Sequence, residues 1–408
     1  MRILLVNHYA GSPAHGMEFR PYYLAREWVR AGHEVLIVAA SYSHVRAVQP
    51  EMRGLPREEV IDGIRYRWLP TPHYGGNGVG RLRNILSFLR QLRGDAYRLT
   101  REFRPDAVIA SSTYPMDVWV ARKLARLAKA KLVYEVHDLW PLSLIELAGM
   151  SPRHPFAMLC GKAETDAYRD ADRVVSMLPC VHEHMASRGL DLSRLHIVPN
   201  GFAPEEWQGD SAPLGEALAA HLAAERAAGR VVVGYAGSMG LPNALDVLLD
   251  AAAQLRETPI SFVLVGSGHE AERLTRRAET EALARVRFFP PIPKAQIPTL
   301  LAQFDIAYIG WQRTPIYRFG IAPNKLIDYL MAGRAVLHSV EAGNDPVAEA
   351  GAGLTVAPED PAAVAEGLRQ LAALAPAERE AMGQRGRAFA MAHHAYPVLA
   401  ERFIQALR

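Results

Sequence analysis

Cysteine and long apolar runs are the two things that this sequence most clearly lacks. Only Cys160 and Cys180 occur among 408 residues, and they fit neither a disulfide framework nor a metal-binding motif. We expect both to be small buried side chains in a reducing compartment. No stretch of about 18 apolar residues occurs, so no transmembrane helix is predicted. The opening run 3–6 is too short for a signal peptide, and the expected location is the cytoplasm, including the inner face of the membrane.

An excess of charge of either sign is also missing. The 46 Lys and Arg residues nearly balance the 43 Asp and Glu residues, which gives a formal net charge of +3. This weak basicity comes with no base-reading motif, so nucleic acid is not an expected partner. Hydrophobic residues make up 50% of the chain, which is ample for two packed domains.

Short apolar runs alternate with helical patterns, and this alternation occurs twice along the chain. In the first half, the expected strands are 3–6, 34–39, 107–110, 132–136 and 173–177. In the second half, they are 231–237, 261–265, 286–289, 306–309 and 335–338. Continuous apolar strands that alternate with helices are typical of parallel sheets covered on both faces. The sequence therefore predicts an α/β protein of two doubly wound, Rossmann-like domains that face each other across a cleft.

A turn signal at Asn200-Gly201 marks the expected boundary between the two domains. We predict domains over residues 1–200 and 201–390, followed by a C-terminal helix within 391–408 that packs back on the first domain. Ligands of such sheets bind at the carboxyl ends of the strands, so candidate site residues are sought there.

The strongest local signal is the loop and helix from Gly320 to Gly333. Pro323 suits the first turn of a helix, and the free N–H groups around Asn324 would attract an anion. Lys325 adds a flexible positive charge that suits a diphosphate, and Asp328 is placed to accept hydrogen bonds from sugar or ribose hydroxyls. The alternative is an ordinary amphipathic helix with a surface lysine.

Several motifs occur in the order that is typical of one enzyme family. They are the Gly16 loop, Arg30-Ala31-Gly32-His33-Glu34-Val35, Asp62-Gly63-Ile64-Arg65, Tyr74-Gly75-Gly76-Asn77-Gly78, Glu135-Val136-His137-Asp138-Leu139-Trp140-Pro141, Val198-Pro199-Asn200-Gly201, Pro323-Asn324-Lys325 and Gly343-Asn344-Asp345-Pro346-Val347. With this ordered set, which spans nearly the whole length, the chain resembles the family-4 retaining glycosyltransferases of the GT-B fold. Within that family it is most similar to bacterial enzymes of surface-polysaccharide and lipopolysaccharide synthesis, including the N-acetylfucosamine transferase type.

The resemblance implies transfer of a hexosyl or N-acetylhexosaminyl unit, with retained configuration, from a nucleotide diphosphate sugar that is expected to be UDP-linked. The first domain would bind a glycan or polyprenyl-diphosphate-linked acceptor, and the second would bind the donor. The leaving phosphate would take the acceptor proton, so neither a metal ion nor a cofactor is expected. Lys325 and backbone amides near Gly16, Gly237 and Gly320 would stabilise the diphosphate.

Two features depart from the family pattern. Gly320 stands where the family has the first of two acidic residues, so the carboxylate expected at the donor sugar is missing. The usual basic pair is replaced by Ser238 and Asn243. Phosphate binding is therefore expected to shift toward Lys325 and the loop 237–240, where glycines permit close backbone approach.

Polar residues also follow the strand 132–136. In the resembling enzymes a histidine at the place of His137 lies beside the transferred sugar, so His137 and its neighbour Asp138 join Lys325 as candidate catalytic residues. Trp140 would line the acceptor side or simply pack. A lone histidine is more often structural, and that interpretation stays open.

Two loops supply the remaining candidates. Amides of the loop that ends in His15-Gly16 are expected at the diphosphate or the acceptor; a plain helix start, with Glu18 complementing the dipole, is the alternative. Phe289 and Pro291 follow a strand of the second half, where the family would hold the pyrimidine edge. A structural Pro-rich turn would explain them equally well.

One acidic motif and one basic helix need separate interpretations. Asp170-Ala171-Asp172 resembles a metal-binding motif of another glycosyltransferase fold, but here the strand follows it rather than precedes it, which favours a solvated helix end. The pattern over 81–93 predicts a basic amphipathic helix. Such a helix contacts an anionic membrane or packs on the core with a solvated basic face.

Two other functions remain open. A sugar-nucleotide 2-epimerase has the same fold, although the missing acid at Gly320 counts against it. A non-catalytic glycan- or nucleotide-binding subunit would also explain the absent acidic and basic partners.

Overall fold

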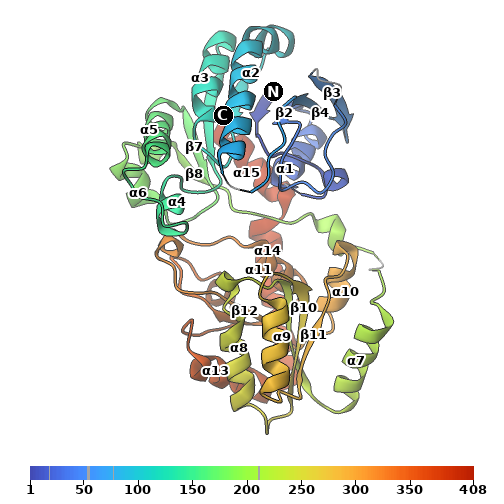
Figure 1. Cartoon of the computed structure of the whole chain (residues 1–408). Helices are drawn as coiled ribbons and strands as arrows, with labels where there is room; N and C mark the ends of the chain where they lie inside the picture. The colour runs from blue at the N-terminus through green and yellow to red at the C-terminus, as the bar shows by residue number, and fades with distance from the viewer. Residues whose placement is uncertain (18, 53–55, 77, 210–211) are drawn as a thin grey trace. The chain divides into compact units, whose positions relative to one another are not determined.

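The computed structural model describes residues 1–17, 19–52, 56–76, 78–209 and 212–408. The chain divides into two compact units, Met1–Asn200 together with Tyr396–Arg408, and Gly201–Ala395 (Figure 1). Each unit is a mostly parallel sheet with helices on both faces, so the predicted fold class of two α/β domains is confirmed.

The sheet of the first unit has the strand order β3-β4-β2-β1-β5-β6-β7-β8. Its strands are β1 (Arg2–Val6), β2 (Glu34–Ala40), β3 (Arg57–Ile61), β4 (Ile64–Leu69), β5 (Ala107–Ala110), β6 (Lys131–Val136), β7 (Arg173–Ser176) and β8 (Leu195–Ile197). All neighbours pair in parallel except β3 and β4, which form a hairpin. Its two-residue turn, Asp62-Gly63, has positive φ at both positions, as hairpin turns of this length require.

Helices cover both faces of this sheet. They are α1 (Phe19–Arg30), α2 (Val79–Phe103), α3 (Asp117–Ala128), α4 (Leu142–Glu146), α5 (Pro155–Asp170), α6 (His182–Ser187) and α15 (Tyr396–Leu407). The C-terminal helix α15 packs on α1: the indole N–H of Trp28 donates to the Ala400 carbonyl at 3.1 Å, and its ring meets Phe403 edge-on. No helix in the described part of the chain is long and apolar enough to cross a bilayer.

The sheet of the second unit is parallel throughout, in the order β11-β10-β9-β12-β13-β14. Its strands are β9 (Val231–Ser238), β10 (Ile260–Ser267), β11 (Val286–Phe289), β12 (Ile306–Gly310), β13 (Ala335–Ser339) and β14 (Gly353–Thr355). Its helices are α7 (Glu216–Ala227), α8 (Leu245–Gln254), α9 (Ala271–Thr280), α10 (Ile297–Leu301), α11 (Asn324–Met331), α12 (Pro346–Ala350), α13 (Pro361–Ala373) and α14 (Pro376–His394).

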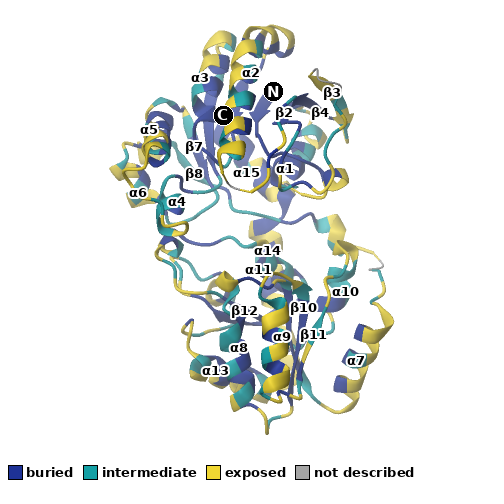
Figure 2. Ribbon diagram, in the orientation of Figure 1, coloured by how far each residue is buried: buried dark blue, intermediate teal, exposed yellow. Residues whose placement is uncertain are grey.

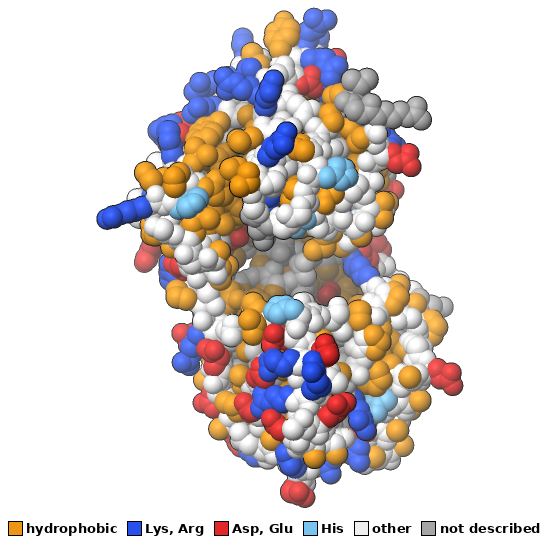
Figure 3. Space-filling view, in the orientation of Figure 1, with side chains coloured by type: hydrophobic (Ala, Val, Ile, Leu, Met, Phe, Trp, Pro, Cys, Tyr) orange, Lys and Arg blue, Asp and Glu red, His pale blue; other side chains and the backbone are white. Residues whose placement is uncertain are grey.

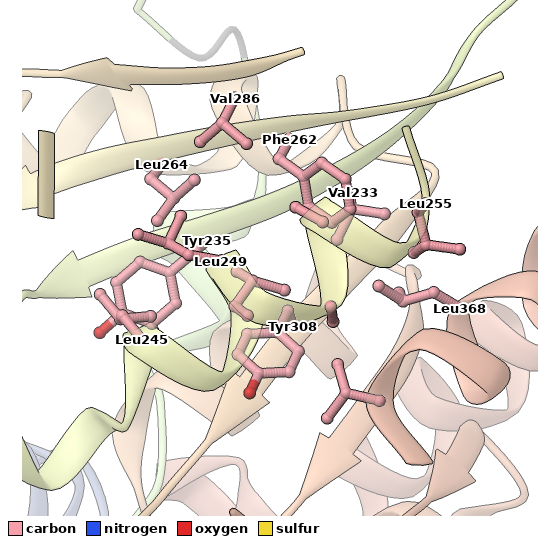
Figure 4. Packing of buried hydrophobic residues seen from close by; sticks show 14 of the residues in the cluster. Val233, Tyr235, Leu245, Leu249, Leu255, Phe262, Leu264, Val286, Tyr308 and Leu368 are labelled. Carbon is pink, nitrogen blue, oxygen red and sulfur yellow. The ribbon is translucent and has the colours of Figure 1, made fainter. Parts of the chain in front are cut away.

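The central strands of both sheets are buried, as the burial colouring shows (Figure 2). In the second unit, Tyr235 of β9 and Tyr308 of β12 pack with Phe262 and Leu249 against α8 (Figure 4). On the other face of the sheet, a Cβ at Gly234 would lie 2.0 Å from the ring of Phe304, so that ring packs directly on the strand backbone. This packing fixes β9, whose carboxyl end carries the candidate site.

Candidate functional site

The side chain of Lys325 lies across the carboxyl end of β9. Its Nζ donates to the Tyr235 hydroxyl at 2.6 Å and to Asn243 Oδ1 at 3.0 Å, and it sits 4.1 Å from the centre of the Tyr235 ring. No carboxylate of the described residues forms an ion pair with it, and burial lowers the pKa of Lys325 to about 7. The helix start of α11 therefore holds a cation that lacks a protein counter-charge.

Gly237 makes this arrangement possible. A Cβ at this residue would lie 2.7 Å from Cε of Lys325, and its φ of 147° belongs to the region that favours glycine. Ser238, the last residue of β9, is exposed at the same edge of the sheet. The structure thus brings together Gly237, Ser238 and Lys325, three residues that the sequence had singled out separately.

The loop before α11 is held by a side chain that our sequence interpretation did not single out. Asn344 accepts from the N–H of Ile321 at 2.7 Å and donates to the carbonyl of the same residue at 3.1 Å. Gly320 is buried, with a φ of 90°, and its N–H donates to the Tyr317 carbonyl at 2.9 Å. Asn324 begins α11 and is exposed. The Gly320 amide is therefore already used within the loop, whereas the start of α11 faces outward.

Asp328 lies one turn after Lys325 and lines a cavity of about 440 Å³ within the second unit. Burial raises the pKa of this carboxyl to about 7. Lys294 and Glu206, which form an ion pair at 2.7 Å, lie on the wall of the same cavity, next to Trp207. A half-protonated carboxyl in such a pocket is suited to hydrogen bonds with hydroxyl groups.

Phe289 and Pro291 occupy the end of β11 and the loop after it. Phe289 is half-buried, and its ring lies 5.4 Å from that of His221, while Pro291 is exposed. Neither residue lines the cavity beside Asp328.

In the first unit, His137 belongs to a buried polar network at the carboxyl ends of β5 and β6. Its Nε2 lies 2.9 Å from Ser111 Oγ and 3.3 Å from Glu135 Oε2. Ser111 donates to Glu135 at 2.6 Å, and Arg20 of α1 pairs with Glu135 at 2.9 Å. The histidine side chain is only 12% exposed, so one edge of the ring is fixed by the protein.

Asp138 and Trp140 shape the turn after β6. Asp138 Oδ1 accepts from the Leu139 N–H at 2.9 Å and from the Ser143 hydroxyl, which ties this carboxylate to the start of α4. Trp140 is buried and meets Phe156 of α5 edge-on. The structure brings both residues near His137 along the chain, but it gives each of them local packing partners.

The loop after β1 is also satisfied within itself. The Gly16 N–H donates to the carbonyls of Ser12 and Pro13, and His15 Nδ1 bonds Ser12 Oγ at 2.9 Å. The buried His15 ring lies 5.1 Å from Trp68, and burial lowers its pKa. Glu18, the residue considered for the helix dipole, lies outside the described residues, as does Asn77 of the 74–78 motif.

Asp170 and Asp172 are both used by the fold. Asp170 pairs with Arg122 and with Arg169, and Asp172 accepts from the Leu132 N–H at 2.8 Å. Across the described ranges, no group of three or more His, Cys, Asp or Glu side chains is placed to hold a metal ion.

The chain matches two family models. Residues 15–201 match the glycosyl transferase 4-like domain, and residues 230–373 match glycosyl transferases group 1. The putative colanic acid biosynthesis glycosyl transferase WcaI of Escherichia coli (strain K12) is 24% identical over 353 residues, which cover 84% of this chain and 86% of that protein.

Solved structures show the same fold. Sucrose-phosphate synthase of Thermosynechococcus elongatus superposes with a TM-score of 0.72 at 18% identity, over 99% of this chain and 98% of that one. HepE of Anabaena, in complex with UDP-glucose, superposes with a TM-score of 0.65 at 15% identity, over 100% and 99% of the two chains. The chain therefore has the two-domain GT-B architecture.

Proposed function

Because this chain combines a glycosyl transferase 4-like domain with a glycosyl transferases group 1 domain, we propose that it is a retaining glycosyltransferase of surface-polysaccharide synthesis. It would move a hexosyl or N-acetylhexosaminyl unit from a UDP-sugar to a glycan or polyprenyl-diphosphate-linked acceptor. Two relatives support these details: WcaI is named for colanic acid biosynthesis, and the solved HepE complex contains UDP-glucose.

The observation that carries this proposal is the uncompensated cation at the start of α11. Lys325 is held over Gly237 by neutral partners, Tyr235 and Asn243, so its charge is available to an anion. A diphosphate at this place would also meet the free N–H groups and the positive dipole end of the helix. Catalysis would consist of positioning and of stabilising the leaving diphosphate, without a metal ion or a cofactor.

Other candidates take roles around this anion site. Asp328, with its raised pKa of about 7, would hold ribose or sugar hydroxyls. His137 would orient the donor sugar, and Asp138 would fix the turn that carries it. Because Gly320 provides no carboxylate, the contacts to the donor sugar would depend more on the first unit than is usual in the resembling enzymes.

Contact with an anionic membrane would bring the enzyme to a lipid-linked acceptor. Arg83, Leu86, Arg90 and Arg93 are exposed on α2, and Figure 3 shows basic side chains over α2 and α3. We expect the protein to sediment with vesicles that contain phosphatidylglycerol, and a variant with Arg83, Arg90 and Arg93 changed to glutamate to stay in solution. Equal sedimentation of the two proteins would contradict this membrane contact.

Thermal unfolding with a panel of UDP-, GDP- and dTDP-sugars, including UDP-N-acetylfucosamine, tests the proposed function. A donor at a hundred times its Kd should stabilise the protein by about 2.7 kcal/mol. With an acceptor, that donor should give a glycoside of retained anomeric configuration by NMR, also in the presence of EDTA. An epimer formed from the donor alone would instead identify an epimerase, and no binding to any member of the panel would indicate a non-catalytic subunit.

A further inference from the structure

The network behind His137 defines where each proton lies. Glu135 is buried, and its Oε1 accepts from Arg20 Nε at 2.9 Å. Burial alone would raise the pKa of Glu135, but Arg20 and then His137 lower it to about 2. Glu135 is therefore a carboxylate at neutral pH, and both of its oxygens only accept hydrogen bonds.

Ser111 passes this constraint on to the histidine. Its hydroxyl donates its one proton to Glu135 Oε2 at 2.6 Å, and its oxygen accepts from Asn7 Nδ2 at 3.2 Å. The 2.9 Å contact between Ser111 Oγ and His137 Nε2 must then be donated by the histidine. Glu135 Oε2, 3.3 Å from the same nitrogen, also favours a proton there. The proton of the neutral ring consequently belongs on Nε2, which leaves Nδ1 as an acceptor.

We propose that Arg20, Glu135 and Ser111 are positioning residues that hold His137 in its Nε2–H tautomer, so that Nδ1 accepts a hydrogen bond from a hydroxyl of the transferred sugar. This inference rests on the proposed function and adds a specificity rule to it. The donor must carry a hydroxyl, and not merely an acceptor such as fluorine, at the sugar position that meets His137.

Arg20 is suited to this task by its geometry. Besides Glu135, its guanidinium serves the carbonyls of Val198 and Pro199, at 2.8 and 2.5 Å. These residues directly precede Asn200, where the first unit ends before the chain enters the second. One planar group thus fixes the carboxylate behind His137 and the exit of the chain, and the single ammonium of a lysine has no comparable fork.

Asp117 is the other acidic group near His137. It is fully buried at the start of α3, where its carboxyl accepts from the Ser112 N–H at 2.9 Å. Burial raises its pKa to about 7, so near neutrality it competes only partly with Glu135 for the charge of the ring. The groups that set the protonation of His137 are therefore Glu135, Arg20 and Asp117.

The first test needs no donor. In the full-length protein with ¹⁵N-labelled histidine, the resonance that disappears in His137→Asn should show a proton on Nε2 that exchanges slowly with water. In Glu135→Gln and Ser111→Ala, that proton should exchange rapidly. A wild-type proton on Nδ1, or an Nε2 proton that exchanges as fast as in the exposed His182, would overturn the inference.

The second test compares two amides. Asparagine places its amide near the position of Nδ1, whereas glutamine places it near Nε2, so His137→Asn should keep about tenfold more kcat/KM than His137→Gln. His182→Gln, on exposed helix α6, should match the wild type. Equal losses in both His137 variants, or a greater loss in His137→Asn, would contradict the role of Nδ1. If no donor is turned over at all, the proposed function fails, and the NMR result alone decides the tautomer.

Discussion

Replacing Lys325 by methionine is expected to lower kcat/KM by about 10²–10³-fold. The methionine keeps most of the stem that crosses Gly237, but it removes the charge that would face the developing diphosphate. Because the native lysine has no acidic partner in the described residues, the change breaks no ion pair and should not destabilise the fold. Initial rates with the donor identified by the panel measure the effect, and Lys162→Met, at a lysine that is 69% exposed, is the matched control.

The low pKa of Lys325 gives this prediction a pH signature. In the free protein the amine is charged below about pH 7, and a bound diphosphate would raise its pKa. The affinity for UDP should therefore fall by up to tenfold per unit as the pH rises above 7, a dependence that Lys325→Met lacks. If calorimetry finds the same pH dependence in the variant, Lys325 is not the phosphate ligand.

Protein stability should respond in the opposite direction. The folded pKa of about 7 lies below the model value of 10.5, so the unfolded chain binds more protons between these two pH values. The contribution of Lys325 to the free energy of unfolding consequently rises from pH 7 to about 10.5. Lys325→Met should be at least as stable as the wild type near pH 7, with the difference shrinking as the pH rises.

The arrangement of most strands follows from local sequence, whereas the hairpin of β3 and β4 was missed. Central strands such as β1 and β5 read as continuous apolar runs because helices cover both faces of the sheet. The segment 57–61 has the sequence Arg-Glu-Glu-Val-Ile, which looks like a charged loop. It lies at the sheet edge, where Arg67 of β4 pairs with Glu58 of β3 and with Asp95 of α2. Edge strands tolerate such charges, and the pairing is non-local.

The same distinction applies to the candidate site. The anion site at Lys325 was predictable because proline, lysine and helix start are adjacent in sequence. The network behind His137 was not, since Arg20 and Glu135 are 115 residues apart and neither lies in a local pattern that announces the other. Alternation along β6 indicated only that Glu135 faces away from Val136. Only the fold shows that this side chain meets an arginine from α1.

Changing Arg20 to methionine should cost about 3–5 kcal/mol of unfolding free energy, because it leaves the buried Glu135 carboxylate without its counter-charge. In the wild type, the lowered pKa of Glu135 contributes stability that is complete above about pH 4.5 and is lost as the pH falls toward 2. Without Arg20, burial should raise this pKa instead, so the variant should lose stability as the pH rises through the neutral range. Urea unfolding at several pH values measures both effects.

Two further variants distinguish the loss of the ion pair from a general packing defect. Arg30→Met, on the same helix but with its side chain 54% exposed, should change stability by less than about 1 kcal/mol. In the background of Arg20→Met, the second change Glu135→Gln should restore part of the loss, because it removes the uncompensated charge while keeping the shape. If the double variant is no more stable than Arg20→Met, the cost arises from the lost hydrogen bonds to Val198 and Pro199 rather than from the carboxylate. The activity of the double variant should nevertheless stay low, because a neutral amide at residue 135 no longer obliges His137 to keep its proton on Nε2.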